Sequence, residues 1–264
     1  MKRSIIPMAA LLAFGVATPV EADTFVLVHG AFQSAVVWDE VAETLRSEGH
    51  NAIAVDLPGR NAVGVAAQTV TLQDYIEATR AVVEAASEPV ILVGHSFGGI
   101  TVSGVAEAVP DQVDLLVYVA AYLPQSGESM ETLALSDADN AFTAETFVIA
   151  EDYSHATILD TDQVRVFAAD ATPEQAAALR ASMVREPLPP IGTPVMLTDE
   201  RIGSVPSAYI RTLKDGTVSP ELQTQMIERA EVETVRDLPS GHAPYLTRPD
   251  NLARLLMDIA EVGA

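Results

Sequence analysis

The chain has 264 residues, of which 48% are hydrophobic, and a formal net charge of −22. This length and apolar content are sufficient for one large domain with an extensive core. The strongly acidic balance argues against binding to nucleic acid or to anionic membrane surfaces, which attract basic proteins. The sequence contains no cysteine, which excludes disulfide bonds and a lipid-modified cysteine near the N-terminus.

The first 22 residues have the three parts of a secretory signal peptide. Lys2 and Arg3 form a basic start, and the apolar segment IIPMAALLAFGVA is too short to cross a bilayer comfortably. The segment VEA then places small residues three and one positions before a cut after Ala22. We therefore expect a cleaved signal peptide at residues 1–22 and a periplasmic or secreted mature protein. An uncleaved anchor is the alternative.

Strand and helix patterns alternate along most of the remaining chain. Apolar runs predict strands at 24–29, 51–59, 89–94, 113–123, 207–213 and 232–238. Amphipathic or capped segments predict helices at 37–49, 71–86, 97–109, 219–230 and 248–262. This alternation is typical of an α/β fold with a mostly parallel sheet and helices on both faces. Function in such sheets lies at the carboxyl ends of the strands.

The pattern changes between residues 124 and 194. This segment is richer in Ser, Asp, Thr and Ala, has weaker strand signals, and contains one clear helix at 172–184 that starts with Thr172 and Pro173. The proline-rich segment PLPPIGTP follows. We interpret residues 124–194 as a cap inserted into a core formed by residues 23–123 and 195–264.

The segment GHSFG, residues 94–98, fits the pattern G-x-S-x-G between a buried strand and a helix. A strand-to-helix turn this tight strains the backbone at its tip, and flanking glycines relieve collisions there. The turn presents Ser96 at the start of a helix, whose N-terminus favours an oxyanion nearby. We interpret Ser96 as a catalytic nucleophile. The alternative is a structural turn whose serine only caps the helix.

A nucleophilic serine needs a base and an acid that orients it. Of the five histidines, His242 follows the last predicted strand, at the sheet edge where a general base belongs. The acid is expected after a strand and between serine and histidine in the chain. Asp215 meets both conditions, although an Asp-Gly turn would also explain it; Asp199, Glu200 and Asp237 are weaker candidates. Backbone N–H groups of Phe97 and Ala31 are the expected oxyanion donors.

Taken together, these segments resemble the α/β-hydrolase fold, and in particular the plant methylesterase and hydroxynitrile lyase group with its bacterial, pyrethroid-type carboxylesterase relatives. The matching segments are FVLVHGAF with the later VW, the segment from Gly49 to Gly59 that ends in AVDLPG, VGHSFGG, YIRTLKDGTVSPELQTQMIE and GHAPYLTRPDNLARLL. The resemblance implies a Ser96–Asp215–His242 triad with Ala31 and Phe97 as oxyanion donors. It also implies a homodimer as one expectation, because members of the group are often dimers.

One departure from the group separates two activities. The lyases carry a lysine after the catalytic histidine and a threonine where Gly30 stands, whereas Ala243 follows His242 here. Cyanohydrin cleavage needs a positive charge near the departing cyanide, so the sequence favours a serine esterase. The alternatives are lactone or amide hydrolysis, lyase-like C–C cleavage, acyl transfer, or a non-catalytic ligand-binding protein.

The expected substrate is a neutral carboxylic ester of small to medium size, because the chain has only 15 lysine and arginine residues and we expect none of them in the motifs that face the pocket. Gly30, Phe32, Tyr122 and Leu123 are the predicted substrate-binding residues, although such side chains also serve in cores. The histidines are scattered, and the sequence has no zinc-protease motif, dinucleotide fingerprint or P-loop. We expect no metal, no cofactor, no nucleic-acid partner and no membrane association after signal removal.

Overall fold

The computed structural model describes residues 22–60, 65–143 and 145–263. Residues 1–21 of the predicted signal peptide lie outside the described residues. Among the described helices, none combines the length and the apolar character needed to cross a membrane.

Among the described residues, six parallel strands form the central sheet in the order β2-β1-β3-β4-β8-β9. The strands are β1 (Thr24–Val28), β2 (Asn51–Val55), β3 (Val90–His95), β4 (Val113–Val119), β8 (Ser207–Thr212) and β9 (Thr234–Leu238). All six residues of β3 are buried, as expected for an inner strand covered on both faces. The predicted α/β-hydrolase architecture with a parallel sheet is confirmed.

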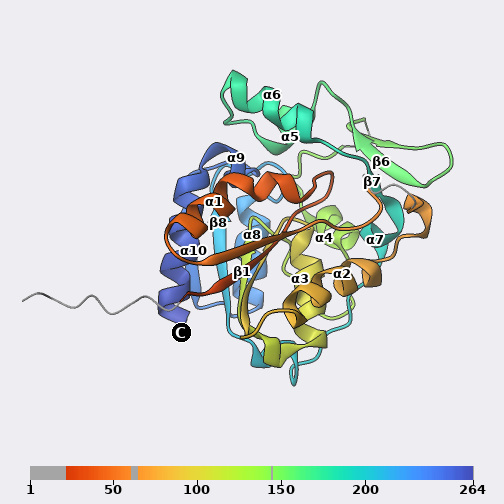
Figure 1. The fold of residues 1–264 in the computed structure, drawn as a ribbon. Coiled ribbons are helices and arrows are strands. Elements are labelled where there is room, and N and C mark those ends of the chain that lie inside the picture. The colour runs from red at the N-terminus through yellow and green to blue at the C-terminus, as the bar shows by residue number, and fades with distance from the viewer. Residues whose placement is uncertain (1–21, 61–64, 144, 264) are drawn as a thin grey trace, which may run out of the picture.

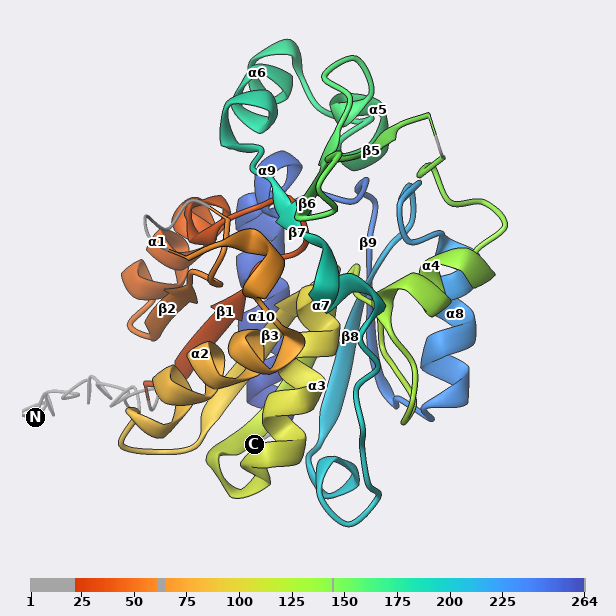
Figure 2. The same cartoon turned by 90° about the vertical axis from the view of Figure 1, so that its right-hand side faces the viewer.

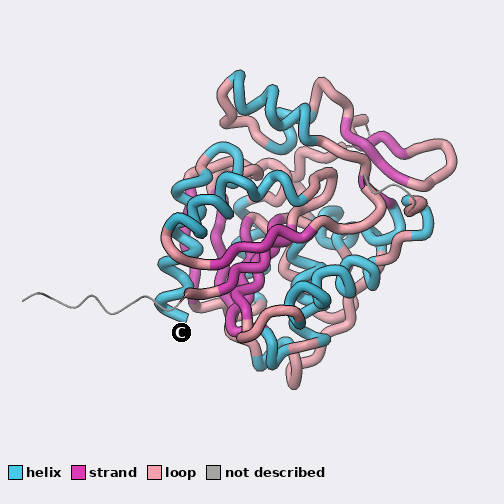
Figure 3. Tube along the Cα trace, viewed as in Figure 1, coloured by secondary structure: helices cyan, strands magenta, loops and turns pink. Residues whose placement is uncertain are grey.

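Helices cover both faces of this sheet (Figures 1 and 3). The core helices are α1 (Asp39–Ser47), α2 (Leu72–Glu84), α3 (Gly98–Ala108), α8 (Pro220–Arg229), α9 (Pro244–Thr247) and α10 (Pro249–Gly263). Helices α1 and α10 pack together on one face, and α2 and α3 pack together on the other (Figure 1). Short 3-10 turns lie at Ala35–Trp38, Ala67–Thr69, Pro110–Gln112 and Ile202–Ser204.

The start of α2 illustrates how local sequence sets these boundaries. The Thr71 hydroxyl accepts a hydrogen bond from the Asp74 N–H, and the Asp74 carboxylate accepts one from the Thr71 N–H at 2.8 Å. This reciprocal pair satisfies two N–H groups that have no acceptor within the helix. Thr172 caps the cap-segment helix in the same way through Gln175.

The segment between β4 and β8 contains the elements that rise above the carboxyl ends of the strands (Figures 1 and 2). It consists of α4 (Met130–Ser136), β5 (Phe147–Ile149), β6 (His155–Ile158), α5 (Gln163–Phe167), α6 (Pro173–Ser182), β7 (Glu186–Pro187) and α7 (Leu188–Gly192). Strands β5, β6 and β7 form a small antiparallel sheet. This segment covers the end of the sheet at which the candidate site lies.

The structure ends one predicted strand early and folds the proline-rich segment into a helix. The apolar run 113–123 predicts one strand, but β4 ends at Val119 because Ala120 has a φ of 47° and turns the chain out of the sheet. The proline-rich segment near residue 190 forms the short helix α7, whose prolines stand at helix-start positions that need no N–H donor.

Candidate active site

Ser96 stands at the tip of the turn between β3 and α3 and has a φ of 53°. A residue with a Cβ rarely adopts this left-handed conformation, which costs about 1–2 kcal/mol. Three hydrogen bonds hold it: the Ser96 N–H donates to the Val119 carbonyl, and the Ser96 carbonyl accepts from Gly99 and Tyr122. The strain predicted from the sequence is therefore present, and the surrounding backbone fixes it.

Gly98 allows this turn to lie directly against β1. A Cβ atom at this position would lie 2.7 Å from the Val28 carbonyl oxygen and 2.9 Å from that of His29. Both partners are backbone atoms, which cannot move aside as a flexible side chain could. Any larger residue at position 98 would therefore push the first turn of α3 away from the sheet and displace Ser96.

Ser96, His242 and Asp215 form one chain of hydrogen bonds. The Ser96 Oγ lies 2.9 Å from His242 Nε2, and His242 Nδ1 lies 2.8 Å from Asp215 Oδ2. A carboxylate only accepts hydrogen bonds, so His242 Nδ1 carries the proton and Nε2 is free to accept from the serine hydroxyl. The arrangement can remove a proton from Ser96 and store it on a charged imidazole.

The loop after β8 fixes the Asp215 carboxylate. Its Oδ2 accepts from the Thr212 hydroxyl at 2.8 Å, and its Oδ1 accepts from the N–H groups of Thr217 and Val218 at 2.8 and 3.0 Å. Together with the His242 bond, these contacts satisfy the buried charge and set the orientation of the imidazole. The Asp215 side chain therefore both stabilises the turn after β8 and orients His242.

The other acidic candidates lie away from His242. Asp199 and Glu200 are exposed. Asp237 is also exposed and forms an ion pair with Arg211, at 2.9 Å between Oδ1 and Nε. Of the four carboxylates considered from the sequence, only Asp215 is hydrogen-bonded to His242.

Two further buried histidines, His95 and His29, form hydrogen bonds with the backbone around the site. His95 Nε2 donates to the His242 carbonyl at 2.7 Å. His29 Nδ1 donates to the Gly30 carbonyl at 2.9 Å, and His29 Nε2 accepts from the Leu57 N–H at 3.2 Å. Burial lowers the pKa of both His29 and His95 well below 6.5. Both rings are therefore neutral at pH 7, and they serve as hydrogen-bonding supports.

The backbone next to Ser96 offers two N–H groups of the kind that an oxyanion needs. Neither the Ala31 N–H nor the Phe97 N–H has an acceptor within the described parts of the chain. Ala31 follows Gly30, where an added Cβ would lie only 2.7 Å from Ser96 Cβ. The loop after β1 therefore lies directly beside the serine, as expected from the sequence.

Aromatic rings of the cap meet Phe32 over the site. Phe32 packs with Phe142, Phe147 and Phe167 at ring separations between 5.7 and 6.3 Å. Phe167 also lies 5.9 Å from the His242 ring. The cap thus encloses the hydrogen-bonded chain, and Ser96 and His242 are only 4% and 1% exposed.

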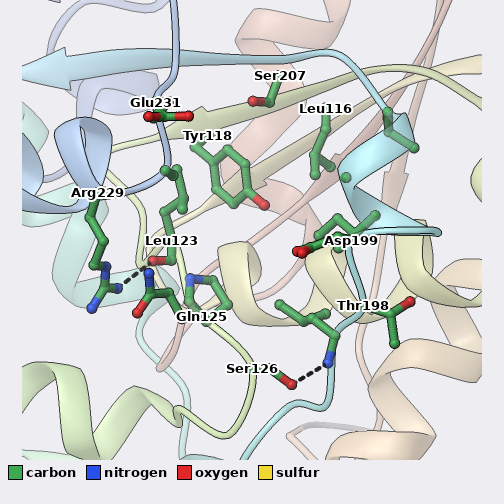
Figure 4. A pocket seen from close by; sticks show the side chains of 16 residues that line it. Leu116, Tyr118, Leu123, Gln125, Ser126, Thr198, Asp199, Ser207, Arg229 and Glu231 are labelled. Carbon is green, nitrogen blue, oxygen red and sulfur yellow. Dashed lines mark hydrogen bonds between the residues drawn. The ribbon is translucent and has the colours of Figure 1, made fainter.

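The remaining predicted substrate residues behave differently from one another. Tyr122 is fully buried, its N–H binds the Ser96 carbonyl, and burial raises the pKa of its phenol. Leu123 instead lines a separate pocket of about 420 Å³ together with Tyr118 and Arg229 (Figure 4). None of Ser96, Asp215 and His242 lines that pocket. Leu123 follows Tyr122 in the chain and lines this other pocket, and its role in substrate binding stays a prediction.

The structure also brings together residues that sequence reasoning missed. Arg60, from the loop after β2, and Glu186, from the cap, form a fully buried ion pair with contacts of 2.8 and 2.9 Å. Glu186 also accepts from the Phe32 N–H and the Tyr75 hydroxyl. Burial raises the pKa of the Glu186 carboxyl, and the Arg60 charge opposes this. A separation of 126 residues between the two charges left no spacing signal in the sequence.

The site contains no evident metal ligand set. Within residues 22–60, 65–143 and 145–263, no group of three or more His, Asp or Glu side chains is placed to hold a metal ion. The chemistry that the described geometry offers is that of an activated serine with two neighbouring backbone donors.

Fold and sequence comparison assign the chain to a family. A model of the alpha/beta hydrolase family matches residues 25–255, and the chain belongs to this family. The pyrethroid hydrolase of Sphingobium wenxiniae is 29% identical over 247 residues, which cover 90% of this chain and 88% of that protein. A protein of Arabidopsis thaliana named "Putative methylesterase 11, chloroplastic" is 31% identical over 258 residues, which cover 92% of this chain and 65% of that protein. The chain thus spans somewhat less than two thirds of that plant relative's length.

Solved structures agree with this assignment. The crystal structure of a pyrethroid hydrolase from Sphingobium faniae has a TM-score of 0.80 at 27% identity and covers 91% of this chain and 98% of that one. Tomato methylketone synthase I has a TM-score of 0.82 at 23% identity, with 93% and 100% covered. The second likeness concerns the fold alone. The group predicted from the sequence motifs is confirmed.

Proposed function

We propose that this protein is a serine hydrolase that cleaves carboxylic esters through an acyl-enzyme. The observation that carries the proposal is the hydrogen-bonded chain from Ser96 through His242 to Asp215, beside two N–H groups without acceptors. A strained serine, a base with a defined tautomer and an orienting carboxylate are the requirements for nucleophilic catalysis. Relatives named as esterases and as a pyrethroid hydrolase support the reaction class.

The proposed reaction has two halves. The Ser96 oxygen attacks the ester carbonyl while His242 Nε2 takes its proton, and the carbonyl oxygen becomes an oxyanion near the Ala31 and Phe97 N–H groups. When the intermediate collapses, the C–O bond to the alcohol breaks and His242 returns the proton to the leaving alcohol. Water then attacks the acyl-enzyme with His242 as base, and the acid and free Ser96 are released.

The proposed substrate is a neutral ester with an apolar part. The ring cluster of Phe32, Phe142, Phe147 and Phe167 gives the cap an apolar underside. Arg60, which is buried nearby, is neutralised by Glu186 and so does not attract a substrate anion. A methyl jasmonate esterase of Vitis vinifera, 28% identical to this chain, is named for an ester of this general kind.

The geometry around Gly30 supports hydrolysis over cyanohydrin cleavage. A Cβ at position 30 would lie 2.7 Å from Ser96 Cβ and 3.0 Å from His95 Nδ1, so the threonine of the lyases does not fit without a shift of the loop. Ala243 is fully buried and supplies no positive charge after His242. The lyase reaction therefore lacks both of its distinguishing side chains in this chain.

Ester turnover with a matched serine variant tests the proposal. The purified chain is assayed with p-nitrophenyl esters of increasing acyl length, with the Ser96→Ala variant alongside. We expect turnover that is lost with Ser96→Ala, and the preferred acyl length measures the space under the cap. Turnover that persists in Ser96→Ala would remove Ser96 from the proposed role.

We further propose that the protein is exported and that the mature chain starts at Asp23. The support is the arrangement of Lys2, Arg3, an apolar segment and the small residues before the expected cut. The acidic, cysteine-free composition is compatible with an exported protein.

A further inference from the structure

The loop that carries Ala31 is bonded to the cap through the next residue. The Phe32 N–H donates to the Glu186 carboxylate at 2.9 Å, and the Phe32 carbonyl accepts from the Val184 N–H at 2.9 Å. Glu186 belongs to β7 and pairs with Ala156 in the small sheet of the cap. A side chain of the cap therefore reaches into the core and binds the backbone beside the proposed oxyanion site.

Phe32 adopts a backbone conformation that needs such support. Its φ is 61°, in the left-handed region that residues with a Cβ rarely enter. A conformation of this kind persists only where the surroundings hold it. The bonds from Val184 and Glu186 satisfy both polar groups of Phe32 and oppose rotation of the Ala31–Phe32 peptide. The Ala31 N–H belongs to the preceding peptide, whose Gly30 carbonyl accepts from His29, so the bonds of Phe32 fix the chain on the other side of Ala31.

Glu186 is in turn fixed by donors from two other elements. Arg60 donates to both carboxylate oxygens, and the Tyr75 hydroxyl donates at 3.0 Å. The guanidinium of Arg60 also lies 4.6 Å from the centre of the Tyr75 ring. Glu186 is 0% exposed and Arg60 is 2% exposed. A buried ion pair is seldom more stabilising than a packed apolar pair, so stability alone explains this arrangement poorly.

We propose that Glu186 is a positioning residue for the oxyanion hole. Its carboxylate, held by Arg60 and Tyr75, fixes the Phe32 peptide and thereby directs the Ala31 N–H toward the substrate oxygen above Ser96. The inference rests on the proposed ester hydrolysis. It also makes the seated cap a condition of catalysis, because movement of residues 184–186 away from the core releases the oxyanion loop.

Two double variants isolate the bond to Phe32. Arg60→Met with Glu186→Gln keeps an amide oxygen that can accept from the Phe32 N–H, whereas Arg60→Met with Glu186→Leu offers no acceptor. Neither leaves a buried unpaired charge. For each, the inhibition constant of a trifluoromethyl ketone is compared with that of the methyl ketone of equal length. The trifluoromethyl ketone forms a hemiketal oxyanion on Ser96, and the methyl ketone reports ground-state binding alone.

The double variant with Glu186→Leu is expected to bind the trifluoromethyl ketone at least ~10-fold more weakly than the double variant with Glu186→Gln. Its kcat should fall by a similar factor. KM and methyl ketone binding should stay within about twofold, because ground-state contacts are unchanged. The surface variant Glu128→Gln, which breaks the Arg229 pair, is the matched control and should leave the ratio of the two inhibition constants unchanged.

Three outcomes would overturn the inference. If the ratio of the two ketone inhibition constants is equal in the two folded double variants, Glu186 has only a structural role. If both variants fail to unfold cooperatively, Tyr75→Phe replaces them, and an unchanged trifluoromethyl ketone affinity there would contradict the proposal. A wild-type protein that neither hydrolyses p-nitrophenyl esters nor binds the trifluoromethyl ketone would overturn the proposed function, and this inference with it.

Discussion

Gly30 lies so close to Ser96 that a Cβ on the glycine would stand 2.7 Å from the Cβ of the serine. The loop after β1 and the turn after β3 are thus in direct contact, and the absence of a side chain at residue 30 permits it. Space for the substrate carbonyl and for the serine hydroxyl depends on the same contact.

Gly30→Ala should therefore reduce kcat by roughly 100-fold, because a displacement of about 1 Å in the reacting groups is sufficient for such a loss. The measurement is steady-state turnover of a p-nitrophenyl ester, with circular dichroism to check the fold. Gly203→Ala is the matched control, since its new Cβ meets nothing closer than 3.7 Å. Full activity in Gly30→Ala would show that the loop is not held against Ser96.

Asp215→Asn should lower kcat by about 10³–10⁴-fold, because an amide in place of Oδ2 would favour the wrong imidazole tautomer. Asp237→Asn is the comparison, since this carboxylate pairs with Arg211 at the surface. Its expected effect on kcat is less than about twofold, in keeping with the small energies of exposed ion pairs. If Asp237→Asn had the larger effect, Asp215 would not be the orienting acid.

Stability should depend on pH through the buried histidines. Burial lowers the pKa of His29 and His95 well below 6.5, so between the folded and unfolded pKa values the unfolded chain binds more protons. The contribution of the two neutral histidines to the free energy of unfolding is then fully present above about pH 6.5. On acidification the free energy of unfolding falls, by up to about 1.4 kcal/mol per pH unit for each histidine. Urea unfolding at pH 7, 6 and 5 measures this.

His29→Gln should reduce the pH dependence of the unfolding free energy if the variant folds, because one of the two buried histidines is removed. An unfolding free energy that is the same at pH 7 and pH 5 would contradict neutral, buried imidazoles at both positions.

Export makes a separate prediction. Expression of the full chain in a Gram-negative bacterium should place the protein in the periplasm with Asp23 as its first residue, as shown by intact mass and N-terminal sequencing. Substitution of Ala22 by a bulky residue should slow the cut, because small residues are needed at that position. A cytoplasmic protein that retains Met1 would exclude the signal peptide.

Much of this fold was predictable because its signals are local. The run VILVG reads as a buried strand, the segment from Thr71 reads as a helix, and the G-x-S-x-G turn places Ser96 between strand and helix. The order of motifs along the chain also predicts Asp215 and His242 as the partners of Ser96, and the structure brings the three residues together.

The contacts between cap and core were not predictable in this way. Arg60 stands after a turn and Glu186 in a proline-rich segment, and neither neighbourhood carries a periodic or capping signal. Only the folded chain brings the two charges together under Phe32.

Covalent labelling shows directly whether Ser96 is the nucleophile. The purified protein is treated with a fluorophosphonate, digested and analysed by peptide mass spectrometry, with Ser96→Ala treated in parallel. We predict one adduct, located on Ser96, together with loss of ester turnover in proportion to labelling. An adduct on another residue, or full turnover by the Ser96→Ala protein, would contradict the role of Ser96 as the nucleophile.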